Sequence, residues 1–405
     1  MSRGGAPDIL DVVDVLVVGG GIIGLSCARE LAAAGLQVEV VERLPSGSAA
    51  SHAAAGMLTA LGDEMPAEFV GVCRESRDLW PAFLAALEEE SGRPIEHDDL
   101  GALVLALSED EAVALDAYVA EVRSAGEEVY EISLDELRRR VPDASPATRR
   151  VLHLPGERRV DNVQVCEALA TAAERRGVRI SYGCEVERVE IAPNVLPDAT
   201  TSAKGVVAHC TGGRREARLL LLTAGAWSGS IPGLPPLSVR PVRGQIVRLA
   251  GVSWPWRGIV RDREHYAVRR GEGSLLVGST LEEAGFAAHV TEAGVRELLD
   301  WARHLFPALA SAPIEAVWAG LRPATPDAMP IIGRPAGPLP GLPVLVATGH
   351  HRNGILLAPW TAREVARLVT TGADGREIFS PARFRSSGPV ATMEPSTETP
   401  RREDL

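Results

Sequence analysis

The apolar positions near the start of the chain predict a strand, a helix and a second strand in close succession. The apolar run 15–18 indicates a buried strand, the spacing over 25–34 indicates a helix, and the run 37–41 indicates a second buried strand. Glycines fill the turn between the first strand and the helix, and Glu42 directly follows the second strand. We therefore expect a β-α-β unit whose first turn lets a ligand approach the backbone closely.

The chemistry of this turn is typical of dinucleotide binding. Gly19, Gly21 and Gly24 let the backbone pass beside a pyrophosphate, and the N-terminus of the helix faces the phosphates. A carboxylate at the position of Glu42 can accept hydrogen bonds from the hydroxyls of a ribose. The motif predicts NAD or the adenosine half of FAD, because the same carboxylate would repel the 2′-phosphate of NADP.

The rest of the chain shows two styles of hydrophobic pattern. Helical spacing alternates with short apolar runs up to residue 223, whereas short strands with brief turns follow one another from 237 to 277. The predicted helices are 67–91, 109–125, 161–176 with Asp161 as N-cap, 292–306 and 354–369. The predicted strands are 102–107, 129–132, 178–181, 185–190, 205–210, 218–223, 266–268, 275–277 and 344–349, with further strands near 249 and 259 and within 316–333.

This alternation predicts an α/β fold with a discontinuous Rossmann-like domain and an inserted antiparallel-sheet domain. We expect the nucleotide-binding domain to comprise residues 10–90, 147–232 and 320–385, and the substrate-binding domain to comprise residues 91–146 and 233–319. Ligand chemistry is expected at the boundary between them. The tail at 386–405 is rich in Pro, Ser, Thr and charged residues and is expected to be disordered.

The composition narrows the classes of function. The chain has 405 residues, of which 45% are hydrophobic, so it can bury a substantial core. A net charge of -12 argues against nucleic acid as a partner. Five scattered cysteines give neither a disulfide framework nor the spacing of a metal site, and no metal is expected. We expect no transmembrane segment and no secretory signal, and therefore a cytoplasmic protein.

Polar side chains gather between the last predicted strand and the final helix. The segment 349–359 places two histidines and Arg352 beside the N-terminus of the helix, where unpaired N–H groups favour negative charge on a ligand. The alternative is that Asn353 only caps the helix and that the histidines lie at the surface. Arg322 ends another predicted strand, and its guanidinium suits bidentate binding of a carboxylate. The alternative there is a structural ion pair with Asp327.

Three segments give the chain a family resemblance. They read SHAAAGML at 51–58, GLRPATPDAMPIIG at 320–333 and GHHRNGILLAP at 349–359. They resemble the signatures of the glycine oxidases of the thiamin pathway, within the D-amino-acid oxidase superfamily, and the similarity runs in order from about residue 12 to 385. The resemblance implies non-covalent FAD, a small amino acid or amine as substrate and O2 as electron acceptor. It also points to a thiazole synthase as partner, and we expect a homo-oligomer.

The same resemblance implies which residues surround the FAD. With the glycines of the first turn, Ile22 and Ile23 would contact the pyrophosphate; Glu42 and Arg43 would lie at the adenosine ribose, and Val186 beside the adenine. The ribityl chain and the ring would be contacted by Ala50, Ser51, Ala55, Gly56 and Met57. The flavin would be lined by His350, His351, Asn353, Gly354, Ile355 and Leu356. Covalent attachment through His52 is the alternative, but His52 lies one position too far from the glycine of its segment.

Four residues are implied at the substrate. Arg322 would bind the substrate carboxylate with Arg352 close by, and Tyr266 would add its hydroxyl to the carboxylate site, with His265 beside it. The match departs from the family pattern here, because the family usually has a proline two residues before an arginine and this chain has Arg269. The alternative for Tyr266 is an exposed tyrosine on a strand.

These residues lead to one hypothesis of function and two rivals. Arg322, helped by Tyr266, would anchor glycine, sarcosine or D-alanine so that the Cα–H points at flavin N5, and hydride transfer would give an imine. O2 would reoxidise the flavin with release of H2O2, and water would turn the imine of glycine into glyoxylate and ammonia; the glyoxylate imine would supply thiamin thiazole synthesis. The nearest rival is a FAD-dependent D-amino-acid or amine dehydrogenase that uses a quinone or carrier acceptor. A nucleotide-binding module without turnover is the second rival.

Overall fold

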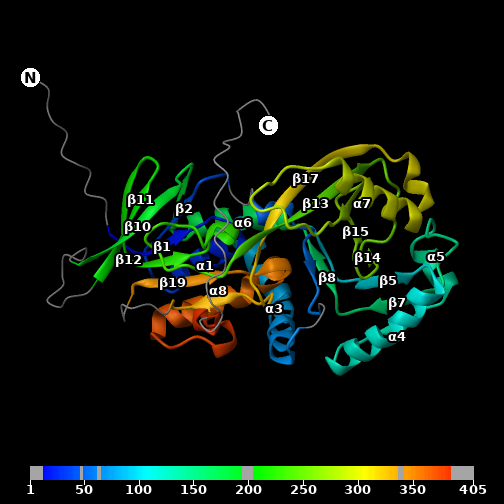
Figure 1. The fold of residues 1–405 in the computed structure, drawn as a ribbon, viewed down its shortest axis with the longest axis horizontal. Helices are drawn as coiled ribbons and strands as arrows, with labels where there is room; N and C mark the ends of the chain where they lie inside the picture. Colours follow the sequence, from blue (N-terminus) through cyan, green and yellow to red (C-terminus); the bar gives the residue numbers. More distant parts are fainter. Residues whose placement is uncertain (1–11, 46–48, 62–64, 194–203, 336–341, 385–405) are drawn as a thin grey trace, which may run out of the picture.

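Two large sheets lie side by side along the longest axis of the molecule (Figure 1). This computed structural model describes residues 12–45, 49–61, 65–193, 204–335 and 342–384. The first sheet gathers strands from three separate stretches of the chain, and the second gathers strands from two. The predicted α/β fold class is confirmed. The predicted disordered tail at 386–405 lies outside the described residues.

Parallel strands form the centre of the first sheet. Its order is β10-β11-β12-β1-β2-β9, and β19 pairs with both β12 and β18. β1 runs parallel to β12 and to β2, and both of the predicted strands of the opening unit are buried almost throughout. Burial on both faces explains their near-continuous apolar runs. The bounds are β1 (Val13–Val18), β2 (Val38–Glu42), β9 (Arg179–Tyr182), β10 (Val186–Pro193), β11 (Lys204–Cys210), β12 (Gly213–Leu222), β18 (Ile331–Gly333) and β19 (Val344–Thr348).

Four helices pack against one another beside this sheet and share its largest apolar core. Asp161 caps α6 by accepting hydrogen bonds from two backbone N–H groups of the first turn, as predicted. Ser76 Oγ and Trp80 Nε1 of α3 both donate to the carbonyl oxygen of Leu356, at 2.7 and 2.9 Å, which fixes the start of α8. The bounds are α1 (Ile22–Ala33), α3 (Ala67–Ser91), α6 (Asn162–Arg175) and α8 (Gly354–Thr371).

The second sheet is antiparallel with one exception. Its order is β17-β13-β16-β15-β14-β5-β7-β6, and only β14 and β5 run parallel, because β5 enters from a different stretch of the chain. α7 (Glu292–Leu305) packs on β13 and β16, and α4 (Glu109–Ser124) starts with a capping box formed by Ser108 and Glu111. The strand bounds are β5 (Ala102–Ala106), β6 (Tyr130–Glu131), β7 (Arg150–Leu154), β13 (Arg240–Ala250), β14 (Ile259–Arg261), β15 (Tyr266–Arg269), β16 (Ser274–Gly278) and β17 (Ile314–Ala324).

Short elements connect the two sheets. A small sheet joins β3 (Met57–Leu58), β8 (Arg158–Val160) and β4 (His97–Asp98), and α2 (Ala50–Ala53) contacts β17 and α6. The sequence-based boundaries at 147 and 320 fall just before β7 and inside β17, and both of these strands pair within the second sheet. The division into two domains therefore stays a prediction, with β7 and β17 as the strands that decide its boundaries.

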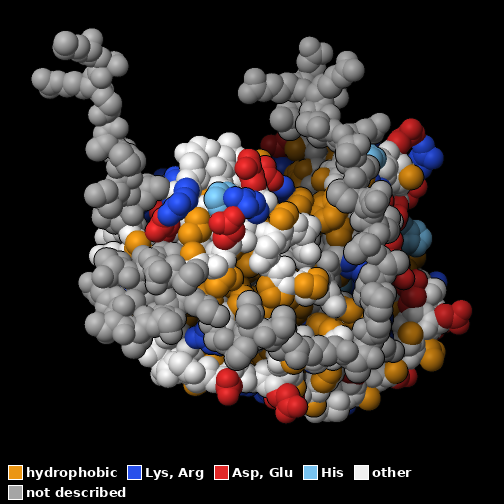
Figure 2. Space-filling model, turned by 60° about the vertical axis from the view of Figure 1, so that its left-hand side comes forward, with side chains coloured by type: hydrophobic (Ala, Val, Ile, Leu, Met, Phe, Trp, Pro, Cys, Tyr) orange, Lys and Arg blue, Asp and Glu red, His pale blue; other side chains and the backbone are white. Residues whose placement is uncertain are grey.

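The surface carries mixed charge. On the face drawn in Figure 2, acidic and basic side chains lie next to one another, with apolar side chains between them. Within the described part of the chain, no helix is long and apolar enough to cross a membrane.

Candidate functional site

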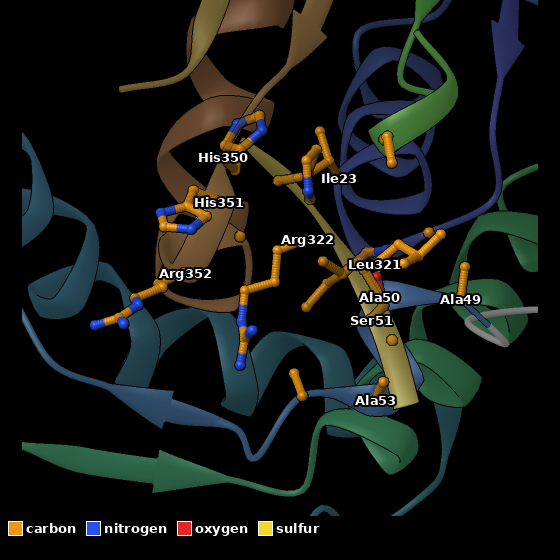
Figure 3. A pocket seen from close by; sticks show the side chains of 18 of the residues that line it. Ile23, Ala49, Ala50, Ser51, Ala53, Leu321, Arg322, His350, His351 and Arg352 are labelled. Carbon is orange, nitrogen blue, oxygen red and sulfur yellow. Dashed lines mark hydrogen bonds between the residues drawn. The ribbon is translucent and has the colours of Figure 1, made fainter. Parts of the chain in front are cut away.

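A cavity of about 740 Å³ is lined by residues from both large sheets. This volume lies in the range typical of cofactor and ligand sites. Figure 3 shows Arg322 between the turn 351–353 that precedes α8, with His351 and Arg352, and the α2 segment with Ser51. Of the residues predicted for the site, only Gly24 and Leu356 lie outside the cavity wall.

The nucleotide end of the cavity depends on glycines that leave no room for a side chain. A Cβ on Gly19, whose φ is +110°, would lie 2.6 Å from the carbonyl oxygen of Thr223. A Cβ on Gly24 would lie 1.9 Å from the carbonyl oxygen of Gly19, so Gly24 serves the contact between helix and strand behind the wall. Glu42 accepts a hydrogen bond from the Gly20 N–H at 2.6 Å, which holds its carboxylate beside the turn.

The N-terminus of α1 fits a pyrophosphate. Gly21 is the N-cap and has no side chain to satisfy the first N–H groups, while Ile22 and Ile23 line the cavity. The N–H of Ile22 donates to Ser51 Oγ at 2.9 Å, which ties the α2 segment to this turn. Beyond Glu42, the guanidinium of Arg43 lies 3.8 Å from the ring centre of Trp227. This arrangement would suit the adenosine half of a dinucleotide, with Glu42 available to a ribose hydroxyl.

The segment from Ala50 to Met57 forms the middle of the wall. Gly56 has a φ of +74°, and a Cβ there would lie 1.9 Å from the carbonyl oxygen of Val160, so only glycine fits. Ala50, Ser51, Ala55, Gly56 and Met57 all line the cavity, and their contact with FAD stays a prediction. His52 is exposed and lies outside the wall, which leaves covalent attachment of FAD through this residue without structural support.

Directly before α8, two neutral imidazoles line the cavity. His350 is buried, its Nε2 lies 3.1 Å from Thr361 Oγ1, and burial lowers its pKa to about 3. Burial and the nearby guanidiniums of Arg322 and Arg352 lower the pKa of His351 to about 4. Both rings are therefore uncharged near neutral pH.

The alternative reading of this segment, a capping asparagine with surface histidines, is wrong. Asn353 stands at the N-cap of α8 but its side chain makes no capping hydrogen bond, and His350 is almost fully buried. The N-terminus of α8 therefore lacks a side-chain cap, and Asn353, Gly354 and Ile355 line the cavity there, where the helix dipole favours negative charge on a ligand. Leu356, predicted to line the flavin, instead packs in the helical core because its side chain faces away from the cavity.

Arg322 is a half-buried cation without a carboxylate partner among the described residues. Its guanidinium donates to the carbonyl oxygen of Thr280 at 3.1 Å and to Ser279 Oγ at 2.6 Å. Asp327, the alternative partner considered from the sequence, instead pairs with Arg383 at 2.7 Å, so that alternative is wrong. Burial lowers the pKa of Arg322, but a guanidinium stays protonated, so an anion is needed to balance this charge.

Space for this guanidinium comes from a neighbouring strand. A Cβ on Gly244 of β13 would lie 2.1 Å from Arg322 Nη1, so any larger residue would displace the arginine. The ladder between β13 and β17 sets Val242 opposite Arg322 and Gly244 opposite Gly320. The pairing of β13 with β17 therefore positions both Arg322 and the space that its guanidinium occupies.

Tyr266 lies at the same end of the cavity. It is half-buried rather than exposed, it hydrogen-bonds Ser279, and a Cβ on Gly278 would lie 2.6 Å from its hydroxyl oxygen. Burial raises the pKa of Tyr266 although Arg322 opposes the change, so its hydroxyl remains a donor. Arg322, Ser279 and Tyr266 together form a polar pocket suited to a carboxylate.

His265 and Arg352 line the cavity in different ways. His265 Nε2 lies 3.0 Å from Glu297 Oε1, and its ring lies against Trp301, so this histidine is held towards α7. Arg352 is exposed and has no carboxylate partner among the described residues. The side chain of Arg352 is therefore more accessible to a ligand than that of His265.

Comparison with known proteins decides the family. Residues 14–368 match the DAO family, described as FAD dependent oxidoreductase. The chain belongs to this family.

Its relatives agree with this assignment. The glycine oxidase of Geobacillus kaustophilus (strain HTA426) is 35% identical over 362 residues, which cover 88% of this chain and 92% of that protein. The bifunctional protein ThiO/ThiG of Nostoc sp. is 32% identical over 361 residues, 88% of this chain, but the match spans only 52% of that protein. A crystal structure of glycine oxidase from Geobacillus kaustophilus superposes with a TM-score of 0.80 at 34% identity, covering 92% of this chain and 98% of that one.

As a DAO-family member, the protein is an FAD-dependent oxidoreductase. The residues fit this cofactor, because the cavity joins a glycine turn and a helix N-terminus at one end to the uncapped start of α8 at the other. The predicted FAD cofactor and enzyme class are confirmed.

Sequence reasoning missed several residues of this flavoprotein's cavity. Ser279 and Thr280 hold Arg322 but belong to no recognisable motif. Their position directly after the apolar strand 274–278, which pairs with the strand of Tyr266, was the one sequence feature that could have indicated them. Arg261 was also missed; it lines the cavity while it pairs with Glu157 at 2.7 Å.

Proposed function

We propose that this DAO-family enzyme oxidises glycine and other small amines or amino acids, such as sarcosine and D-alanine. One observation carries the proposal: Arg322 lies half-buried in the cavity wall without a carboxylate partner among the described residues. A small zwitterion would supply the missing anion. The similarity to the glycine oxidase of Geobacillus kaustophilus supports this choice of substrate.

The geometry of the substrate end suggests how the residues act. Arg322 would bind the substrate carboxylate, and the hydroxyl of Tyr266 would donate a second hydrogen bond to it. Arg352, at the rim of the cavity, would add positive potential that favours an anionic group. Two fixed contacts to one carboxylate would orient the Cα–H, and positioning of this kind provides much of the rate enhancement.

FAD supplies the hydride acceptor for this chemistry. The uncapped N-terminus of α8 offers N–H groups where negative charge is favoured, and the neutral rings of His350 and His351 add no charge that would compete. We assign no general base, because a deprotonated substrate amine can react without one.

We further propose that O2 accepts the electrons with release of H2O2, and that the imine product or glyoxylate supplies thiazole formation in thiamin biosynthesis. The bifunctional ThiO/ThiG relative of Nostoc sp. supports a thiazole synthase as partner. A cytoplasmic location and a homo-oligomeric state belong to the same proposal.

An anaerobic screen of glycine, sarcosine and D-alanine tests the substrate class. Bleaching of the yellow flavin by these compounds is the expected result. The absence of bleaching with all of them would contradict the proposal and favour a nucleotide-binding module without turnover.

The electron acceptor needs a separate measurement. Fast reoxidation in air with formation of peroxide is the expected result. Slow reoxidation in air combined with a fast reaction with a quinone would favour a FAD-dependent amine or D-amino-acid dehydrogenase instead.

A further inference from the structure

Arg270 is a buried charge outside the cavity wall. It directly follows β15, and only 7% of its surface is exposed. Its guanidinium leaves its own sheet and donates to the carbonyl oxygens of Ala55 and Val160, both at 3.0 Å, and to Asn162 Oδ1 at 2.5 Å. Each of these acceptors belongs to the segment 50–57 of the cofactor cavity or lies directly against it.

Asn162 extends this contact along the wall. It is fully buried at the start of α6, and its Nδ2 donates to the carbonyl oxygens of Ser51 at 2.6 Å and His52 at 3.1 Å. Ser51 Oγ in turn accepts the N–H of Ile22 at the start of α1. An unbroken chain of hydrogen bonds therefore runs from the end of β15 to the turn that fits the pyrophosphate.

The shape of this contact suits a guanidinium. Its acceptors lie in several directions, and a planar fork with fixed donors can reach them together, whereas a lysine would reach one at a time. Burying a cation is costly without such partners, and Asp161 Oδ2 at 3.6 Å from Arg270 Nε supplies the countercharge. Arg77 of α3 offers a contrast: it is comparably buried, but its guanidinium donates to the two carboxylate oxygens of Glu127, at 2.7 and 3.0 Å, rather than to the segment 50–57.

We infer that Arg270 and Asn162 are positioning residues that hold the segment 50–57 against FAD and in fixed relation to β15, the strand that carries Tyr266. Neither residue touches the cavity directly; they act through the backbone of Ser51, His52 and Ala55. The inference needs only FAD as cofactor and holds whichever amine is oxidised.

Two substitutions separate the parts of this chain of contacts. Arg270→Lys keeps the charge but loses the fork, and Asn162→Asp keeps an acceptor for Arg270 but removes the donor to Ser51 and His52. Each should weaken FAD binding about 10- to 100-fold, because one or more buried hydrogen bonds are lost. Release of fluorescent flavin on dilution of the holoenzyme measures this loss, and the visible spectrum of the flavin that stays bound should shift.

Arg77→Lys is the matched control, because it perturbs a comparably buried arginine that contacts Glu127 and not the segment 50–57. It should lower the melting temperature but leave FAD release and the flavin spectrum unchanged. The inference is overturned if FAD leaves the two test variants no faster than it leaves Arg77→Lys, or if their spectra match the wild type. If Arg270→Lys does not fold, Asn162→Asp and the milder Asn162→Ser decide by the same two measurements. Glycine enters neither measurement, so the result is independent of the proposed substrate.

Discussion

The two ends of the cavity are built in opposite ways. At the nucleotide end, backbone groups and side chains close in sequence meet: Gly20 and Glu42 are 22 residues apart and belong to one β-α-β unit. At the substrate end, Arg322 from β17 is held by Ser279 and Thr280, which follow β16 and lie 43 and 42 residues away. The nucleotide end is specified by a local pattern, whereas the substrate end exists only after the second sheet has formed.

The difference extends to charge. The charged side chain of the nucleotide end has its partners within the chain, since Glu42 accepts hydrogen bonds from two backbone N–H groups. The substrate end leaves a half-buried guanidinium without a carboxylate partner among the described residues. Under the proposed function, the first end would be preformed for the cofactor, and the second would be completed by the substrate.

Of the substitutions that test the difference between the two ends, replacing Arg322 should have the largest effect, a loss of glycine binding. Arg322→Ala removes the cation that awaits the substrate, and the loss of about 3 kcal/mol corresponds to roughly 100-fold weaker glycine binding with unchanged FAD content. Anaerobic titration of flavin bleaching with glycine measures the effect. Arg383→Ala, which breaks the ion pair with Asp327 instead, is the control and should titrate like the wild type. A wild-type curve for Arg322→Ala would remove this arginine from the carboxylate site.

Filling the clearance beside Arg322 should have the next largest effect. Gly244→Ala would place a methyl group against the guanidinium, and overpacking of about 1–2 kcal/mol predicts roughly 10-fold weaker glycine binding. Gly71→Ala is the matched control, because a Cβ at that helical position meets nothing within 4 Å. Equal glycine affinity in Gly244→Ala and Gly71→Ala would show that the position of Arg322 does not depend on this space.

A substitution at the nucleotide end should weaken the binding of FAD and leave the binding of glycine unchanged. Glu42→Gln weakens the charge-assisted contact to the turn and to the ribose, and we expect roughly 10-fold weaker FAD binding with unchanged glycine affinity once FAD is saturating. Flavin release on dilution and the bleaching titration together measure both quantities. Glu190→Gln, at an exposed ion pair on β10, is the control. A change in glycine affinity without a change in FAD binding would reverse the assignment of the two ends.

The smallest effect is expected at Tyr266. Tyr266→Phe removes one neutral hydrogen bond while Arg322 remains, so glycine binding should weaken only about 3- to 5-fold. Tyr130→Phe, which alters an exposed tyrosine on β6, serves as the control. An unchanged saturation curve in Tyr266→Phe would exclude its hydroxyl from the carboxylate site.

The same contrast explains what the sequence could predict. The opening unit, the full extent of α3 and the cap of α6 at Asp161 follow from local periodicity and capping rules, and the structure has them. The glycine turn and Glu42 could be assigned because they lie within one short stretch of the sequence that carries a known binding motif. Arg322 and Tyr266 could be proposed because they lie within or near segments that carry a family resemblance.

The rest depends on contacts that no local pattern encodes. Ser279 reaches Arg322 only because β13, β16 and β17 are placed in register, and the parallel pairing of β14 with β5 joins two distant stretches of the chain. Leu356 lies on the same short helix turn as cavity residues, and packing against α3, rather than its position in the motif, turned it into the core. The partner of Asp327 is likewise Arg383, 56 residues away, which proximity in sequence could not indicate.

The pairing of β13 with β17 has a consequence for protein engineering. Gly244 and Arg322 lie two residue pairs apart on one ladder, so a graft that exchanges both strands between homologues transfers the arginine together with the space that admits it. Exchanging either strand alone would separate them, leaving either a crowded arginine or unfilled space. Chimeras should therefore keep β13 and β17 from the same parent, so that the arginine and its space are inherited together.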